Sequence, residues 1–440
     1  MSYCWRLGRE FIEFKNEKIM NQENEIEVLG FWWVLGHSED RFPGILKYSK
    51  ENGTVLQILC DRDYKEFWDY NKRYDIIYGV ADNMTFTMYH CSQAGSSESG
   101  VNYYSFRSEY LFVHNTNYLE NGEDMAFNRI DVRMNNTNDF FRGFQIFNVE
   151  KEYGETNDTG KYTIDYNLKQ IGFNINDKLT GNIRTGYNQN EQFSEKTFSI
   201  EGKIWFCIES NDNSLISIHL LLDKMNYLRI FFSIVVQGMT VYDEVVGKRF
   251  DFEQDMKIYL RNDFGEPFRR FTIFDYDKVN EKFSSILERW FHLTQEIPEV
   301  INLFYNTYTS TNFYEYHYRD TYVALEGLYR WKLKRNTSGN IVPGLLNTIN
   351  SKKDIFPIFL KIVENYKIWG ETARKNRVYL THLNEEISTN DLVDNVGLLK
   401  LMRKMQAIIL FYILEELRLS DDEIETSFRK LETYFLPFIF

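Results

Sequence analysis

The 440-residue sequence is poor in residues that break or cross-link a chain. It has only six prolines and no long Gly-, Ser- or Pro-rich tract, which excludes an extensively disordered or fibrous protein. Its four cysteines, Cys4, Cys60, Cys91 and Cys207, lie far apart, and none belongs to a CxxC pair. This spacing argues against a zinc finger and against a secreted disulfide scaffold, so we expect reduced thiols.

Long apolar runs are also missing. The longest run in the C-terminal half, AIILFYIL at 407–414, falls far short of the roughly 20 residues that span a bilayer. The first residues, MSYCWRLGREFIEFKNEK, carry charges where a signal peptide needs an apolar segment. We therefore expect a soluble, cytoplasmic protein that does not bind membranes.

Basic residues are in the minority, with 51 Lys and Arg against 64 Asp and Glu and a net charge of −13. This balance excludes a protein that coats nucleic acid through a diffuse basic surface, because the chain as a whole repels phosphates. It still permits a local basic cleft.

Familiar motifs for nucleotide, acyl and metal chemistry are absent from the sequence. No GxGxxG opens a helix, and there is no GxSxG or HExxH. The stretch GETNDTGKYT at 154–163 has Tyr162 where a phosphate-binding loop carries Ser or Thr, so it predicts a turn. The seven histidines do not cluster by spacing, and we expect His37, His90 and His219 to be structural rather than ligands. We expect no metal and no cofactor.

Hydrophobic periodicity divides the chain into two parts. Residues 1–275 are predicted to be β-rich, because short runs of β-branched and aromatic residues are separated by polar turns. GILKYSKENGTVLQIL predicts a hairpin whose turn contains Asn52-Gly53. The apolar stretch LRIFFSIVVQGMTVYDEVV at 228–246 is also predicted to be a strand. This pattern predicts a sandwich or barrel-like region, with inserted helices.

Residues 276–440 are predicted to form an all-α bundle of about five helices, so the fold class is α+β. The stretch 277–297 spaces its apolar residues along one helical face, and residues 338–344 are predicted to be a connection. The long stretch 391–419 is apolar on more than half of its surface, as a central helix would be. Ser420 and Glu423 predict a capping box at the start of a final helix.

The stretch ARKNRVYLTHLNEE at 373–386 places Arg377 and His382 five positions apart in a predicted helix. Arg offers a fixed charge and a planar set of donors to phosphate oxygens, and His moves protons near neutral pH. Together they meet the minimum for cleaving RNA by attack of its own 2′-hydroxyl, without a metal. Five helical residues rotate by about 140° and rise by about 7.5 Å, so one pair does not converge on one phosphate. Either Arg377 lies at an irregular helix start, or two protomers line one cleft.

Arg377-Val-Tyr-Leu-Thr-His382 resembles the Arg…His signature of the HEPN superfamily of ribonucleases. YRDTYVALEGLYRW resembles the early helix of that family, which carries a glutamate, here Glu326. LLKLMRKMQAIILFYILEEL resembles the helix that closes its bundle. The resemblance implies a dimeric, metal-independent nuclease in which Arg377 stabilises the transition state and His382 is the general base or acid. Many members carry Asn, Asp or His after the arginine, where this sequence has Val378.

The N-terminal half carries a second resemblance. GFWWVLGHSEDRFPGILKYSKENGTVLQI and YDIIYGVADNMTFTMYHC resemble the β-rich N-terminal domain of ApeA-type anti-phage proteins, which precedes an HEPN domain. This resemblance implies a bacterial abortive-infection effector. Residues 1–275 would sense or regulate, and residues 276–440 would degrade cellular RNA once a phage-derived trigger is present.

Basic residues near the pair predict a local patch for RNA phosphates, with affinity that falls steeply as salt rises. Tyr379 would stack a base, or it packs within the bundle. The predicted RNA-binding residues are Arg330, Lys332, Lys334, Arg335, Arg374, Lys375 and Tyr379.

Structural roles are the alternatives for the predicted catalytic residues. Arg377 would then lie on a solvated helix face and His382 in a helix interface. Glu326 either orients one of these two or forms a salt bridge on the helix surface. Two other functions stay open. One is an inactive HEPN bundle for dimerisation or for binding RNA or protein, and the other is a carbohydrate- or peptide-binding β-sandwich with a helical oligomerisation tail.

Overall fold

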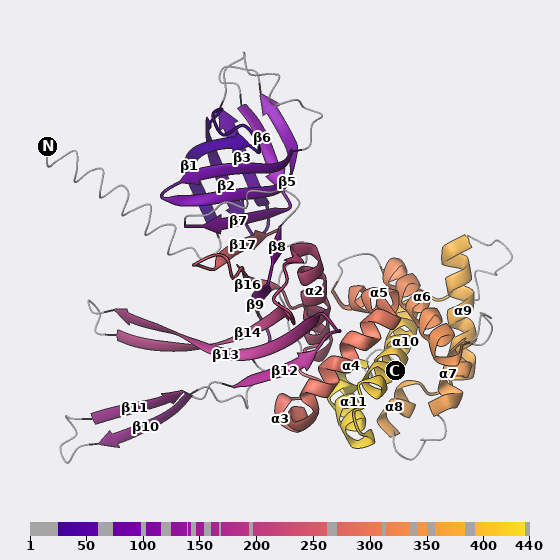
Figure 1. The fold of residues 1–440 in the computed structure, drawn as a ribbon. Helices are drawn as coiled ribbons and strands as arrows, with labels where there is room; N and C mark the ends of the chain where they lie inside the picture. Colours follow the sequence, from indigo (N-terminus) through magenta and orange to yellow (C-terminus); the bar gives the residue numbers. More distant parts are fainter. Residues whose placement is uncertain are drawn as a thin grey trace, which may run out of the picture. The chain divides into compact units, whose positions relative to one another are not determined.

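The computed structural model describes residues 25–59, 74–97, 103–115, 125–138, 140–141, 147–153, 160–166, 169–192, 197–261, 271–309, 314–334, 341–349, 357–382 and 392–435. The chain is α+β, with a β-rich N-terminal region followed by helices, as predicted (Figure 1). It divides into two compact units whose segments alternate along the sequence. Unit 1 comprises Met1–Arg133, Phe206–Asp223 and Val241–Gly265, and unit 2 comprises Met134–Trp205, Lys224–Thr240 and Glu266–Phe440. The predicted domain boundary after residue 275 stays a prediction.

Six antiparallel strands of unit 1 close into a barrel. Each strand pairs with the next in the order β1–β2–β3–β6–β5–β4, and β4 pairs back with β1. The predicted barrel-like region is therefore confirmed. The strands are β1 (Glu25–Val34), β2 (Phe42–Ser49), β3 (Gly53–Leu59), β4 (Tyr74–Ala81), β5 (Met84–Ser97) and β6 (Tyr103–Ser108).

The barrel core forms around Trp32. Side chains of β1 alternate between buried and exposed positions, which places Trp32 inside, with 0% of its surface exposed. Its indole Nε1 donates a hydrogen bond to the Gly44 carbonyl at 3.0 Å. A Cβ atom at Gly79 would lie 2.1 Å from the indole ring, so only glycine fits opposite it.

The predicted hairpin at Asn52-Gly53 is confirmed. Ser49 of β2 pairs with Gly53 of β3, and Gly53 has φ +68°, a conformation that glycine adopts without strain. The turn signal in this stretch was local, which is why the sequence alone was sufficient.

Further strands of unit 1 extend from the barrel through β5, in the order β5–β7–β17–β16–β9. They are β7 (Tyr110–His114), β9 (Arg129–Met134), β16 (Tyr242–Lys248) and β17 (Met256–Leu260), with the short pair β8 (Ala126–Phe127) and β15 (Ile216–Ser217) beside them.

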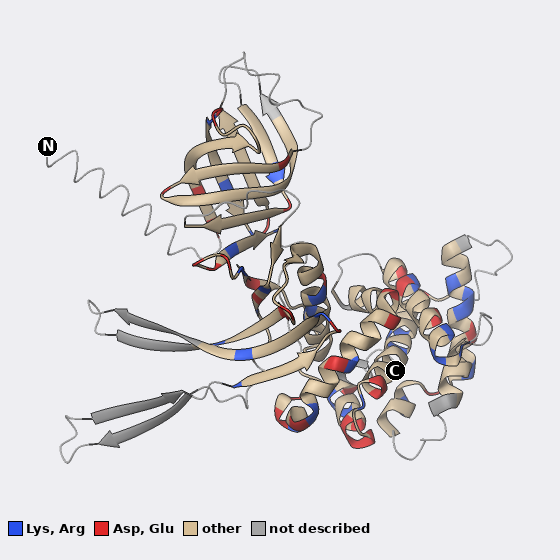
Figure 2. Ribbon diagram, viewed as in Figure 1, with Lys and Arg blue, Asp and Glu red and all other residues tan. Residues whose placement is uncertain are grey.

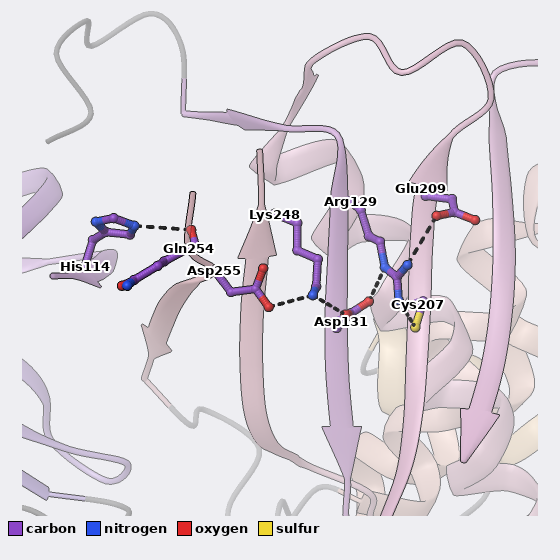
Figure 3. A network of polar contacts seen from close by, with 8 residues as sticks. All are labelled: His114, Arg129, Asp131, Cys207, Glu209, Lys248, Gln254 and Asp255. Carbon is purple, nitrogen blue, oxygen red and sulfur yellow. Dashed lines mark hydrogen bonds and ion pairs between the residues drawn. The ribbon is translucent and has the colours of Figure 1, made fainter. Parts of the chain in front are cut away.

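A network of charged side chains ties these outer strands together (Figure 3). Asp131, which is 2% exposed, accepts from Arg129 Nε at 2.5 Å, and the ammonium of Lys248 lies 3.6 Å away. Lys248 also bonds Asp255, and Arg129 reaches Glu209 at 3.5 Å. Cations and carboxylates alternate along the network, so we assign it a structural role. Figure 3 also shows Cys207, His114 and Gln254 at its margins.

Unit 2 contains the strands β10 (Phe147–Tyr153), β11 (Gly160–Tyr166), β12 (Gln170–Asn174), β13 (Leu179–Gln192) and most of β14 (Thr197–Ser210). β10 pairs with β11, and β12 to β14 are successive neighbours in a sheet. Within the predicted turn at 154–163, residues 160–163 belong to β11, and 154–159 lie outside the described residues. Residues 206–209 of β14 belong to unit 1, and they pair with β9 within that unit.

The strand predicted over 228–246 is wrong in its first half. Residues Ile218–Val235 form helix α2, and only Tyr242–Lys248 form a strand, β16. The helix is buried around most of its circumference, so its sequence carries almost no 3.6-residue period and its β-branched and aromatic residues imitate a strand.

The C-terminal part is a helical bundle. It comprises α3 (Tyr276–Val279), a 3₁₀ turn (Asn280–Lys282), α4 (Phe283–Glu296), α5 (Pro298–Thr309), α6 (Tyr314–Leu333), α7 (Ile341–Ile349), α8 (Pro357–Ile362), α9 (Tyr366–His382), α10 (Asn395–Glu416) and α11 (Asp421–Phe435). The predicted central helix is confirmed, because every residue from 405 to 414 of α10 is buried. The capping box is confirmed as well: Ser420 donates to Glu423 through both its amide and its hydroxyl.

Two helices of the bundle were not predicted. α5 begins directly at Pro298, because proline is well tolerated in the first turn, where its missing N–H costs nothing. α7 occupies part of the predicted connection at 338–344. Among the described residues, none of the helices combines the length and apolar character that crossing a membrane requires.

Helix α2 contributes to the core of unit 2. The Trp290 indole donates to the Tyr227 carbonyl at 2.8 Å, which joins α4 to α2. Arg229, only 1% exposed, donates to the Thr240 carbonyl at 3.1 Å and to the Tyr305 hydroxyl of α5. The bundle therefore includes a helix that precedes its other helices by some forty residues of chain.

Candidate active site

The predicted catalytic pair lies on α9, which packs against α6 within unit 2. Tyr318 of α6 is fully buried, and its hydroxyl donates a hydrogen bond to the Ala373 carbonyl at 2.6 Å. Burial holds the pKa of Tyr318 well above its usual value, so the hydroxyl stays a donor. This bond fixes α9 against α6 one helical turn before Arg377.

Glu326 lies on the same face of α6 as Tyr318, eight residues further along the helix. It is 8% exposed, and its carboxylate faces two guanidinium groups. Arg330 Nη2 donates to Glu326 Oε1 at 2.7 Å, and Arg377 Nη2 lies 3.7 Å from Glu326 Oε2. A buried carboxylate is costly unless it is paired, and these two cations supply the pairing.

Arg377 is held more loosely than Arg330. Its ion pair with Glu326 is longer than a hydrogen bond, and its guanidinium lies 6.0 Å from the centre of the Tyr322 ring. Its side chain is 26% exposed, and Nε is buried without a hydrogen-bond partner among the residues that the structure describes. The guanidinium therefore has donor capacity left for an acceptor that reaches it.

The Tyr322 ring of α6 lies beside this guanidinium. Its pKa rises to about 12, chiefly through burial and then through the charge of Glu326, while Arg377 and Arg374 act in the opposite direction. The phenol is therefore protonated at neutral pH and can donate a hydrogen bond.

His382 is the last residue of α9, and its side chain lies outside the described residues. Helix α9 runs without interruption from Tyr366 to His382, so Arg377 is well inside it. Of the two arrangements considered from the sequence, an irregular helix start at Arg377 is therefore wrong.

The predicted RNA-binding residues fall into two groups. Arg374 lies on α9, where it donates to both carboxylate oxygens of Glu371 at 2.7 and 3.0 Å, and Lys375 and Tyr379 are half-buried on the same helix. Figure 2 shows basic residues along α9. Together with Arg330 and Arg377, these residues gather on α6 and α9.

The second group lies at the end of α6. Lys332 pairs with Glu415 at 3.3 Å and with Glu416 at 2.5 Å, at the end of α10. Lys332 is rotated about 120° around α6 from Glu326, so it does not belong to the group of side chains around Glu326. Lys334 is exposed just beyond the helix, and Arg335 lies outside the described residues.

Asn376 is a residue that the sequence analysis missed. It is 2% exposed; its amide donates to the Thr372 carbonyl at 2.8 Å, and its Oδ1 accepts from the Val393 amide at 3.1 Å. The side chain thus ties the chain entering α10 to the turn of α9 that carries Arg377. Asparagine is a poor helix former, so its position inside a predicted helix was the sequence signal that Asn376 makes a specific side-chain contact.

Comparisons with known proteins give two matches. A family model described as ApeA N-terminal domain 1 matches residues 27–290, and one described as Apea-like HEPN matches residues 315–423. The second match contains α6, α9 and α10, and with them Glu326, Arg377 and His382. The comparison with curated proteins found no match, and neither did the comparison with solved structures.

Proposed function

Since the chain belongs to the ApeA family, whose N-terminal domain 1 matches more than half of its length, we propose that it is an anti-phage abortive-infection effector. Its Apea-like HEPN domain would be a metal-independent endoribonuclease that cleaves cellular RNA in the cytoplasm. Arg377 and His382 would be its catalytic residues, and Glu326 a positioning residue.

One observation carries the proposal: the half-buried guanidinium of Arg377 has an unsatisfied Nε within the described residues. A buried donor without a partner costs about 1–3 kcal/mol, and a phosphoryl oxygen would remove that cost once the 26% exposed side chain turned Nε toward it. Arginine suits this role because its donors match phosphate oxygens and its charge persists at every physiological pH. Glu326 lies 3.7 Å from Nη2 of the guanidinium and does not occupy Nε.

The reaction follows from these groups. The RNA 2′-hydroxyl attacks the adjacent phosphorus while an imidazole takes its proton, and the O2′–P bond forms. The P–O5′ bond breaks, and the 5′ oxygen takes a proton from a general acid. Arg377 neutralises charge that accumulates on the non-bridging oxygens. The products are a 2′,3′-cyclic phosphate and a 5′-hydroxyl, and no metal enters the balance.

We propose that two protomers form the cleft. On the continuous helix α9, Arg377 and His382 differ by about 140° in direction and 7.5 Å in height, so one copy does not close on one phosphate. A twofold interface would bring two arginines and two histidines together. Residues 1–275 would sense a phage-derived trigger and regulate residues 276–440.

The purified 440-residue chain, mixed with an extract that supplies the phage-derived trigger, tests the proposal directly. We expect wild type to cleave cellular RNA in the presence of EDTA and to leave the two products named above. Arg377→Ala and His382→Ala should each reduce cleavage at least about 100-fold while keeping wild-type circular dichroism and oligomeric state. Arg429→Ala is a matched control, because it removes a guanidinium paired at i,i+4 with Glu425 on α11.

The same variants separate the alternatives in a host challenged with phage. Equal protection by wild type, Arg377→Ala and His382→Ala would favour an inactive HEPN bundle that binds RNA or protein. Strict dependence on magnesium would contradict the metal-independent mechanism. Cleavage by a monomeric variant would contradict only the shared cleft.

RNA affinity should fall steeply with salt, and a flat response would argue against the basic patch on α6 and α9.

A further inference from the structure

A second set of chemically active side chains lies in unit 1. His90, Glu109 and His219 are far apart in the sequence, yet each offers a ligand atom, and these atoms lie within 4.8 Å of one another. His90 Nδ1 is 2.8 Å from Glu109 Oε2, and His219 Nδ1 is 3.9 Å from Glu109 Oε1. We propose that this His₂Glu cluster binds a divalent transition-metal ion of the zinc class.

The backbone fixes the positions of His90 and Glu109. β5 pairs with β7 as far as Tyr89 and with β6 from Ser92 onward, so His90 lies where β5 changes partner. His90 has φ +52°, a conformation that residues other than glycine rarely adopt and that often marks functional positions. The Glu109 amide donates to the Tyr89 carbonyl at 3.1 Å, which holds Glu109 beside His90.

Aromatic rings hold the imidazoles. The His90 ring stacks on the Tyr89 ring with 3.9 Å between their centres, and the His219 ring lies 5.4 Å from the His90 ring. The Tyr110 ring meets His219 edge-on at 5.2 Å, and His219 itself lies in the first turn of α2. Packing of this kind restricts rotamers and arranges ligands before an ion arrives.

The distances require only a small adjustment. Zinc binds nitrogen and carboxylate oxygen at about 2.0–2.2 Å, which separates two tetrahedral ligand atoms by roughly 3.3–3.6 Å. Glu109 must therefore move slightly away from His90 and slightly toward His219. The three side chains are between 43% and 48% exposed, so they can make this movement and leave a fourth position open.

The donor types select the ion. Two imidazoles and one carboxylate suit zinc and its transition-metal neighbours, whereas magnesium and calcium prefer oxygen ligands alone. Asp75 adds negative charge nearby, because it lies between the β4 residues that pair with Tyr89 and Cys91 and is therefore across from His90. The Tyr110 hydroxyl, 3.0 Å from His219 Nδ1, competes with the ion for that nitrogen.

Zinc binding to the full chain tests the proposal and does not depend on nuclease activity. The protein is stripped with EDTA, dialysed against zinc and analysed for metal content, for affinity by chelator competition and for thermal unfolding. The variants are His219→Ala, Glu109→Gln and His90→Asn, the last because asparagine tolerates positive φ. His37→Ala is the control, since His37 is also exposed in unit 1 and lies 4.0 Å from Asp40.

We expect wild type and His37→Ala to bind one zinc ion per chain and to unfold at a higher temperature with zinc. Each ligand variant should bind at least about tenfold more weakly and lose the thermal shift. Tyr110→Phe should bind zinc as tightly as wild type or more tightly. Equal zinc affinity in wild type and the ligand variants would overturn the proposal, and so would loss of binding in Tyr110→Phe alone.

Discussion

The substitution Glu326→Gln tests whether the carboxylate contributes mainly through its ion pair with Arg377 or through its ion pair with Arg330. Gln keeps the length of the side chain and one acceptor oxygen but removes the charge, so it weakens both ion pairs without opening a cavity. The site is 8% exposed, and water therefore compensates little for the loss.

The two pairs differ in what their loss should cost. Arg330 is 54% exposed, so its 2.7 Å bond to Glu326 contributes at most about 1 kcal/mol to folding. Arg377 is 26% exposed, and Glu326 is the carboxylate that faces it. Without that charge the guanidinium loses its fixed direction, and we expect cleavage to fall about 10–100-fold, equivalent to about 1.4–2.8 kcal/mol of transition-state stabilisation.

A double-mutant cycle measures the coupling. Cleavage rates of wild type, Glu326→Gln, Arg377→Ala and the double variant are compared, with Arg330→Ala measured separately. If Glu326 acts through Arg377, Glu326→Gln lowers kcat with little change in KM and has no further effect once Arg377 is absent. Arg330→Ala should leave kcat within about threefold of wild type, and its loss of a phosphate contact should appear in KM. Full activity of Glu326→Gln, or losses that add in the double variant, would refute this reasoning.

Three further predictions concern stability. Gly79→Ala should lower the free energy of unfolding by about 2 kcal/mol, because the new methyl group meets the Trp32 ring at 2.1 Å; urea denaturation measures this. Asn376→Ala should cost about 1 kcal/mol by leaving a half-buried amide without its partner, and hydrogen exchange should rise at the entry to α10. The pair of Glu423 with Lys282 should stabilise the fold at neutral pH. Despite partial burial, hydrogen bonds from Lys282 and the cap lower the Glu423 pKa, so this stability is lost as pH falls below about 4.

Two of the three stability predictions have a control. Gly95→Ala places a methyl group where no atom lies within 4 Å, and an equal loss there would contradict the steric argument at Gly79. For Glu423, the substitution Glu423→Gln retains capping but not charge. Its stability difference from wild type should be constant between about pH 6 and 8 and shrink toward pH 3; a difference that grows with acidity would contradict the pairing.

Local signals predicted much of the fold. The hairpin at Gly53 and the cap at Ser420 follow from residues within four positions of one another, and the alternation in β1 follows from burial of one face. Helix α2 could not be predicted in this way. A helix that is buried on most sides has no polar face, so its sequence does not show the 3.6-residue period of a helix.

The chemistry of the sites was predictable only where it is local. Arg377 and His382 lie on one helix, and so their spacing was visible in the sequence. Glu326 and Arg377 lie 51 positions apart in the sequence, on two different helices. From the sequence alone, a salt bridge on the helix surface was therefore as good an interpretation of Glu326 as a pairing with Arg377. His90, Glu109 and His219 come from the middle of β5, the link between β6 and β7, and the start of α2, so no sequence spacing could group them. The polar network around Asp131 was invisible for the same reason.

The alternation of segments between the two units has a consequence for protein synthesis. When the ribosome has translated residue 240, strands of unit 2 and α2 already exist, but unit 1 still lacks β16 and β17. The bundle that carries Arg377 is completed last, so a prematurely terminated chain contains barrel strands without a finished nuclease candidate. A gene fragment that starts at residue 276 reverses this order: its product would uncover the faces of Trp290 and Tyr305 that α2 normally binds.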